Sequence, residues 1–156
     1  MLMDHQQPWF DILTASSPHV HTSGAVRAWV SMPVGWGKGH TVAAAIKHLY
    51  DLGAVRRVLY VSAVPRQYTA NELSNHSIPH RVLIVKPSEA VSMAGVDIVS
   101  PDALYAGHDT WIKYGGYDLV VLDLHRNPLL GTPRQRDAAL TVLGMDTKVW
   151  MLGCGV

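Results

Sequence analysis

The stretch that most constrains this chain is residues 28–46, AWVSMPVGWGKGHTVAAAI, where an apolar run leads into glycines and then into alanines. The apolar run predicts a buried strand, and the alanines favour a helix because alanine loses little conformational entropy there. Between them, Gly35, Gly37 and Gly39 predict a turn whose backbone N–H groups converge on one point at the helix start, which suits a phosphate. Lys38 stands where its ammonium would reach the outer phosphates. A glycine-rich turn without a ligand is the alternative.

The metal-holding part of this pattern is incomplete. The general phosphate loop places Ser or Thr directly after the lysine, where its hydroxyl holds Mg²⁺. Here Gly39 follows Lys38, and Thr41 comes two residues too late unless the loop is rebuilt. A nucleotide site also needs an acid at the end of a buried strand. Asp123, which ends the apolar segment 117–123, fits that role, although a strand-end acid also serves to cap a following turn.

Strand-like and helix-like segments alternate along the whole chain. Apolar runs typical of strands covered on both faces occur at residues 25–32, 57–63, 81–85, 96–100, 117–123 and 148–152. Helices are expected at residues 2–15, from the glycines to 52, and at 67–75, 102–114 and 133–143. Gly53 should end the second helix and Thr132 should cap the last. The alternation predicts an α/β domain with a mostly parallel sheet and helices on both faces.

Composition narrows the function classes. A chain of 156 residues is expected to form one domain, and its net charge of +1 with 16% charged residues gives no strong field for polyanions. The one cysteine, Cys154, excludes a disulfide framework and a cysteine-based zinc site. No apolar run approaches the roughly 18 residues of a membrane span, and the N-terminus is unlike a signal peptide. A cytoplasmic protein without a membrane partner is therefore expected.

Six segments carry motif-like patterns along the chain: residues 2–6 (LMDHQ), 32–38 (MPVGWGK), 58–65 (VLYVSAVP), 96–104 (VDIVSPDAL), 117–127 (YDLVVLDLHRN) and 149–153 (VWMLG). Taken in order, they resemble the first RecA-like lobe of superfamily 2 helicases, closest to Swi/Snf-type DNA translocases and DEAH-box-like enzymes. The first is similar to the segment whose glutamine reads adenine, and the fifth to the motif "wDlVIlDEaHrikN". The resemblance implies a three-layer RecA-like domain of the phosphate-loop NTPase class over residues 1–156, with residues 1–24 packed on it as a helix and loop.

The resemblance also implies a set of binding residues. Those expected to bind nucleotide, with ATP as the ligand, are Gln6, Gly35, Trp36, Gly37, Lys38, Gly39 and Thr41. Asp123 would hold Mg²⁺ weakly, and whether the metal binds at all is left open. Contacts to DNA or to a helicase-like protein are expected from Arg66, Ser100, Arg134 and Arg136. Trp111 and Trp150 are expected in the core. A metal site shared by His40 and His125 is not expected, because no carboxylate-rich shell is evident.

Departures from the family pattern argue against turnover, so no catalytic residue is assigned. Gly39 stands in place of the hydroxyl, Leu124 stands in place of the catalytic glutamate, and the sequence ends before a second lobe with its arginine finger. Losing a positioned base forfeits about 10²–10⁴-fold in rate, and an absent arginine finger about 10³–10⁵-fold.

The expectation is a hydrolysis-deficient lobe that binds nucleotide, DNA or a helicase-like partner, as would suit a compact genome such as a phage's. One alternative is the ATP-binding lobe of a DNA-dependent ATPase or translocase that a second polypeptide completes. Another is a structural descendant with an empty site. The sequence predicts no oligomeric state.

Overall fold

The computed structural model describes residues 2–15, 27–31, 37–63, 65–83, 95–106, 116–124, 130–143 and 148–153. Its helices are α1 (Gln7–Ala15), α2 (Lys38–Asp51), α3 (Arg66–Asn75) and α5 (Pro133–Leu143), and residues 101–106 form a further short helix. Its strands are β1 (Arg27–Ser31), β2 (Arg57–Ser62), β3 (His80–Val82), β4 (Gly95–Val99), β5 (Leu119–Asp123) and β6 (Lys148–Gly153). The elements follow the order that the sequence predicts.

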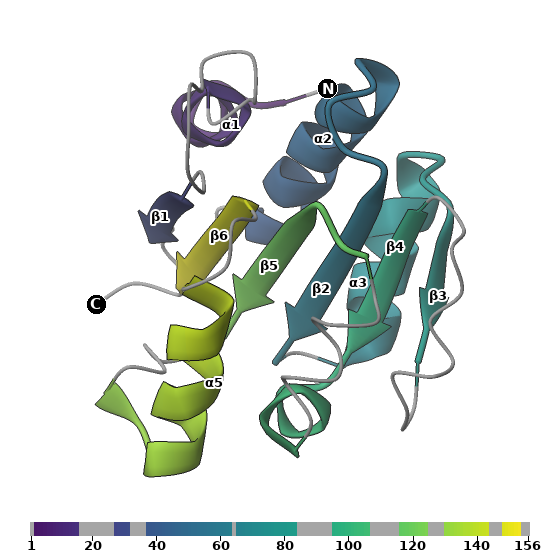
Figure 1. Cartoon of the computed structure of the whole chain (residues 1–156). Coiled ribbons are helices and arrows are strands. Elements are labelled where there is room, and N and C mark those ends of the chain that lie inside the picture. The colour runs from purple at the N-terminus through teal and green to yellow at the C-terminus, as the bar shows by residue number, and fades with distance from the viewer. Residues whose placement is uncertain are drawn as a thin grey trace.

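The six strands form one sheet in the order β1-β6-β5-β2-β4-β3, and every neighbouring pair is parallel. The carboxyl ends of the strands therefore share one edge of the sheet, which we call the carboxyl edge (Figure 1). The register places Asp123 beside Ser62 of β2 on one side and beside Leu152 of β6 on the other. The prediction of a mostly parallel α/β sheet is confirmed.

Alternate residues of the central strands point into two separate cores, one on each face of the sheet. Val58 and Tyr60 of β2 belong to a core that includes side chains of α1, α2 and α3. Leu59 and Val61, which alternate with them, belong to a second core with side chains of residues 101–106 and α5. Figure 1 shows α2 and α3 behind the sheet and α5 in front of it. The result is three layers, in which fully buried Trp150 lies in the first core as predicted.

Glycines mark both ends of α2. The N-cap Gly37 has φ 77°, in the left-handed region where glycine carries no Cβ penalty. At the other end Gly53 has φ 73°, and its N–H donates to the carbonyl of Tyr50 at 3.0 Å. The N–H of Ala54 donates to the carbonyl of Leu49 at 2.9 Å. This pair of bonds is a Schellman motif. Gly53 thus ends the helix as the sequence predicts.

The start of α5 is fixed by a reciprocal cap. The N–H of Gln135 donates to Thr132 Oγ1 at 3.3 Å, and the N–H of Thr132 donates to Gln135 Oε1 at 3.1 Å. Together they form a capping box, with Pro133 at the first helical position, where a missing N–H costs nothing. The predicted cap at Thr132 is confirmed.

None of the helices in the described ranges is long and apolar enough to cross a membrane.

A buried ionic cluster joins the first residue of β2 to the middle of β4. Asp97 accepts hydrogen bonds from Arg81 Nε at 2.8 Å, from Arg57 Nη2 at 3.3 Å and from the Tyr117 hydroxyl at 2.6 Å. Burial, and then the bond to Asp97, raise the pKa of Tyr117, so this hydroxyl stays a neutral donor. The cluster ties β2, β3 and β4 to the segment that leads into β5.

Candidate functional site

Two opposite charges meet at the carboxyl edge. Lys38 is the first residue of α2, and Asp123 is the last residue of β5. The Lys38 Nζ lies 2.5 Å from Asp123 Oδ1, and the two side chains are 15% and 5% exposed. The structure thus joins the two residues that the sequence analysis assigns to phosphate and to metal. The ion pair thus lies at the amino end of α2, where the helix dipole favours a bound anion.

The second oxygen of Asp123 is held by Tyr60. The Tyr60 hydroxyl, on a buried side chain of β2, donates to Asp123 Oδ2 at 2.9 Å. Burial, followed by the negative charge of Asp123, raises the pKa of Tyr60 well above its usual value. The hydroxyl therefore remains protonated and fixes the carboxylate in one orientation. Sequence reasoning missed Tyr60, because a tyrosine inside an apolar strand is typical of a core position.

A pocket of about 410 Å³ opens beside this ion pair. It lies between the start of α2, helix α3 and the ends of β2 and β5. Its volume falls within the range of roughly 300–1,000 Å³ usual for small-molecule sites. The lining residues are Lys38, Gly39, Ala43, Tyr60, Tyr68, Thr69, Asn71, Glu72, Leu73 and Asp123. Lys38, Gly39 and Asp123 are thus the predicted site residues that face a common cavity, and the wall from α3 was not predicted.

Gln6 lies against the turn that opens α2. Its side chain is 5% exposed, and its Oε1 accepts a hydrogen bond from the N–H of Met3 at 3.0 Å. A Cβ placed on Gly37 would lie 2.3 Å from Gln6 Nε2, so a larger residue at position 37 would collide with this amide. Gly37 is therefore required both by its φ and by the approach of Gln6. The predicted residues Gly35 and Trp36 lie outside the part of the chain that the structure describes.

The positions that would carry hydrolytic chemistry hold other contacts. The hydroxyl of buried Thr41 donates to the carbonyl of Gly37 at 2.9 Å, within its own helix. Gly39 has no side chain, and a Cβ there would meet Glu72 Cγ at an ordinary 3.5 Å. Leu124 is buried in the second core, on the face of the sheet opposite α2. His125 and Arg126 lie outside the described residues.

The residues expected to meet DNA or a partner come from several elements outside the pocket lining. Arg66 begins α3, and its Nη1 approaches the carbonyl of Leu83 at 3.5 Å. Ser100 follows β4, and its Oγ accepts the N–H of Ala103 at 3.2 Å, which caps the short helix. Arg134 and Arg136 are exposed near the start of α5. Among the described residues, none of these four lines the pocket.

Comparison with known proteins identifies the fold. No protein-family model and no curated protein matches the sequence. One similar solved structure is a nuclease-deletion mutant of the Type ISP restriction-modification enzyme LlaGI in complex with a DNA substrate mimic. It has a TM-score of 0.64 and 14% identity, and the match covers all of this chain and 17% of that one. Another is the C-terminal domain of a possible DNA helicase from Lactobacillus plantarum WCFS1, with a TM-score of 0.51, 12% identity, and 99% and 87% coverage.

The all-parallel sheet with helices on both faces, which this chain shares with these structures, fits a RecA-like α/β domain and confirms the predicted fold class. At 14% and 12% identity the likeness concerns the fold alone. The chain spans 17% of the length of the LlaGI chain, so the activity of that larger protein is not carried over with the fold.

Proposed function

We propose that this chain is a hydrolysis-deficient helicase-like lobe of Swi/Snf type that holds the phosphates of a nucleotide and acts by binding. The observation that carries the proposal is the Lys38–Asp123 pair beside a pocket of about 410 Å³, at the amino end of α2. A helix start, a left-handed glycine and an ammonium at one point form an arrangement suited to a phosphate.

Lys38 is the residue that would bind a phosphate in this pocket, next to its ion pair with Asp123. An ammonium has three N–H donors, and Asp123 Oδ1 is one acceptor of the Lys38 ammonium. A phosphate that enters the pocket from the α3 side would meet the same ammonium together with the first N–H groups of α2. Gln6, which lies against Gly37, is the residue we assign to the base of the nucleotide. ATP is accordingly the ligand that we propose.

Binding without turnover follows from the side chains around the pair. The hydroxyl of Thr41 is bonded within α2, and Gly39 offers none, so Mg²⁺ would depend on Asp123 and water. Leu124 packs into the opposite core and cannot accept a proton from water. Loss of a general base alone lowers the rate by about 10²–10⁴-fold. We therefore expect nucleotide binding that depends little on Mg²⁺ and has no useful hydrolysis.

DNA or a helicase-like protein is the proposed partner. One similar structure is a complex with a DNA substrate mimic, and the other is a domain of a possible DNA helicase. In this chain the exposed Arg134 and Arg136 near the start of α5, with Arg66 and Ser100 at the carboxyl edge, are the candidate contacts. Arginine is suited to phosphate oxygens because its guanidinium donates two parallel hydrogen bonds.

A second candidate is an ATP-binding lobe of a DNA-dependent ATPase that another polypeptide completes. It is favoured by Glu72, a carboxylate from α3 that lines the same pocket as Lys38 and Asp123. If Glu72 oriented the attacking water, the missing glutamate after Asp123 would be replaced from another element. This candidate predicts tight Mg²⁺-dependent binding and turnover stimulated by DNA.

Titration with a fluorescent ATP analogue, with and without Mg²⁺, separates the two candidates. Lys38→Ala should weaken binding by about 10–150-fold, the equivalent of one charge-assisted hydrogen bond of roughly 1.5–3 kcal/mol. Lys47→Ala is the matched control, because Lys47 lies on the same helix and pairs with the exposed Asp51 at 3.1 Å. Phosphate release in the presence of DNA would refute the hydrolysis-deficient proposal. Absence of nucleotide binding in the unaltered chain would refute the assignment of the pocket.

A further inference from the structure

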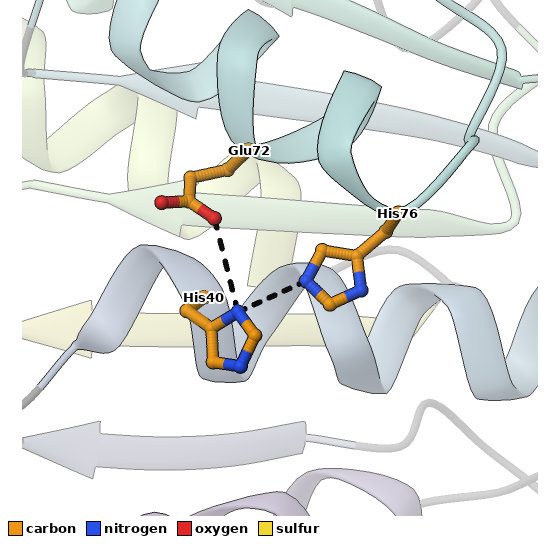
Figure 2. A group of neighbouring side chains, drawn as sticks. All are labelled: His40, Glu72 and His76. Atoms are coloured by element: carbon orange, nitrogen blue, oxygen red, sulfur yellow. Dashed lines mark hydrogen bonds and ion pairs between the residues drawn. The ribbon is translucent and has the colours of Figure 1, made fainter. Parts of the chain in front are cut away.

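Three side chains of metal-ligand type converge between α2 and α3 (Figure 2). His40 comes from the first turn of α2, and Glu72 and His76 come from α3 and its C-cap. The His40 Nδ1 lies 3.1 Å from His76 Nε2 and 3.9 Å from Glu72 Oε2. One ligand atom from each residue lies within 4.8 Å of the other two. The pocket beside Lys38 does not account for this convergence, because His40 and His76 are not among its lining residues.

We propose that His40, Glu72 and His76 form a binding site for a divalent transition-metal ion of the zinc class, with water as the fourth ligand. Imidazole nitrogen and carboxylate oxygen are ordinary zinc ligands, and two histidines with one glutamate are a known three-ligand set. Tetrahedral bonds of about 2.0–2.1 Å place neighbouring ligand atoms roughly 3.3 Å apart. The observed separations of 3.1 and 3.9 Å lie on either side of that value.

The helix geometry holds the α3 ligands in place before any ion binds. Glu72 and His76 are four residues apart, so they lie on the same face of the helix, one turn apart. The helix ends in a Schellman motif, in which the N–H of Ser77 donates to Ser74 and that of Ile78 donates to Leu73, both at 3.0 Å. Ser77 has φ 57° and Ile78 is buried, which fixes the chain just after His76. Such a fixed backbone favours metal binding because little freedom remains to be lost.

The cluster is reachable by an ion from solvent. The side chains of His40 and Glu72 are 30% and 37% exposed, and the two imidazole rings lie 4.9 Å apart at a tilt of 40°. Without a metal, the close nitrogens of His40 and His76 require that one donates and the other accepts a hydrogen bond. With a metal, both lone pairs point at the ion and the remaining N–H groups turn outward. The same three side chains thus have an unliganded and a liganded arrangement that differ by small rotations.

A metal at this position would join α2 to α3. Both helices supply walls of the pocket, and Glu72 belongs to the pocket lining as well as to the cluster. Zinc would therefore rigidify the wall that faces Lys38, whether or not a nucleotide binds there. From the sequence, a metal shared by His40 and His125 was not expected, because no carboxylate-rich shell was evident. The carboxylate comes from α3 instead.

The test is a zinc titration of the metal-free, untagged chain by competition with a chromogenic chelator, repeated with cobalt to record the visible absorption of a tetrahedral site. One equivalent should bind to the unaltered chain. His40→Ala and His76→Ala should each weaken binding by at least about tenfold. His48→Ala is the matched control because His48 lies on the same helix, outside the cluster, with its ring against Phe10. This control should bind zinc as the unaltered chain does.

A second variant guards against loss of fold. Glu72→Gln keeps the shape of the side chain but removes its charge, and it should weaken zinc binding while its thermal unfolding without metal stays unchanged. Cobalt absorption of the tetrahedral type that disappears in His76→Ala would support the site. Equal zinc uptake by the unaltered chain and His76→Ala would overturn the proposal, because the ion would then lie on other histidines. No uptake by the unaltered chain would overturn it as well.

Discussion

Substitution of either member of the Lys38–Asp123 pair should lower stability, but by unequal amounts. The carboxylate of Asp123 is more deeply buried than the ammonium of Lys38, so it is the more costly of the two charges to leave unpaired. Lys38→Met leaves the 5%-exposed carboxylate of Asp123 with the Tyr60 hydroxyl as the side-chain donor that the structure describes. Removing one partner of a buried pair costs about 3–5 kcal/mol, because the other charge stays buried and uncompensated. For a chain of this length, each kcal/mol corresponds to a Tm decrease of roughly 2–4 °C. A Tm loss on the order of 10 °C is therefore expected.

Asp123→Asn should cost less. The amide oxygen of asparagine still accepts the hydrogen bond of Tyr60, and the side chain of Lys38 is 15% exposed on a flexible stem that lets its ammonium reach water. We expect a loss of about 1–2 kcal/mol, the scale of one hydrogen bond. The double variant Lys38→Met/Asp123→Asn should be more stable than Lys38→Met alone, because it no longer buries an unpaired charge.

Equilibrium urea unfolding followed by far-UV circular dichroism measures all three free energies. Lys47→Met supplies the control for loss of a lysine from α2, and it should change stability by less than about 0.5 kcal/mol because its pair with Asp51 is exposed. A Lys38→Met variant as stable as Asp123→Asn would refute the reasoning. So would a double variant whose loss equals the sum of the two single losses, because the side chains would then act independently.

Two further predictions concern Tyr60 and Leu124. Because burial raises the pKa of Tyr60, the unfolded chain releases this proton above about pH 10 while the folded chain keeps it. The contribution of Tyr60 to the free energy of unfolding is therefore complete below that pH, and it falls by about 1.4 kcal/mol per pH unit above it. Tyr60→Phe should remove that share of the slope in urea unfolding between pH 10 and 11, and an unchanged slope would contradict the assignment. Leu124→Glu should cost more than about 3 kcal/mol by placing a charge in the second core, without restoring phosphate release. The control Leu130→Glu, at an 85%-exposed position, should leave the free energy of unfolding nearly unchanged. DNA-dependent phosphate release by Leu124→Glu would contradict the prediction.

Much of the fold and part of the site are predictable because they depend on local patterns. Apolar runs between turn signals predict parallel strands, and parallel strands place their last residues at one edge. Lys38 and Asp123 each lie at that edge, one after a strand and one at the end of another, so their proximity follows from topology. Their direct ion pair does not follow, because it also depends on which strands are neighbours and where α2 begins.

The remaining contacts depend on packing between elements that the sequence does not order. Tyr60 is a core residue by its surroundings, and only the register of β2 with β5 brings its hydroxyl to Asp123. Glu72 and His76 show a helical spacing of four, which indicates a shared face. Nothing in that spacing tells which helix the face meets, so the approach of His40 from α2 could not be inferred. The ionic cluster at Asp97 could not be predicted for the same reason, because its arginines come from β2 and β3, the strands on either side of β4.

The two faces of the sheet divide the chemistry of this chain. The face toward α2 and α3 carries Lys38, the pocket and the histidine cluster, and it receives the side chain of Asp123. The next residue, Leu124, packs into the core of the opposite face, in line with the alternation of side chains along a strand. The groups that attract a phosphate thus lie on one face, whereas the position after Asp123 contributes to stability on the other. Among the described residues that line the pocket, Glu72 of α3 is the acid besides Asp123. A Glu72 bound to a metal with His40 would leave this pocket a binding site, whereas a Glu72 that orients a water at the phosphate would make it the site of an enzyme.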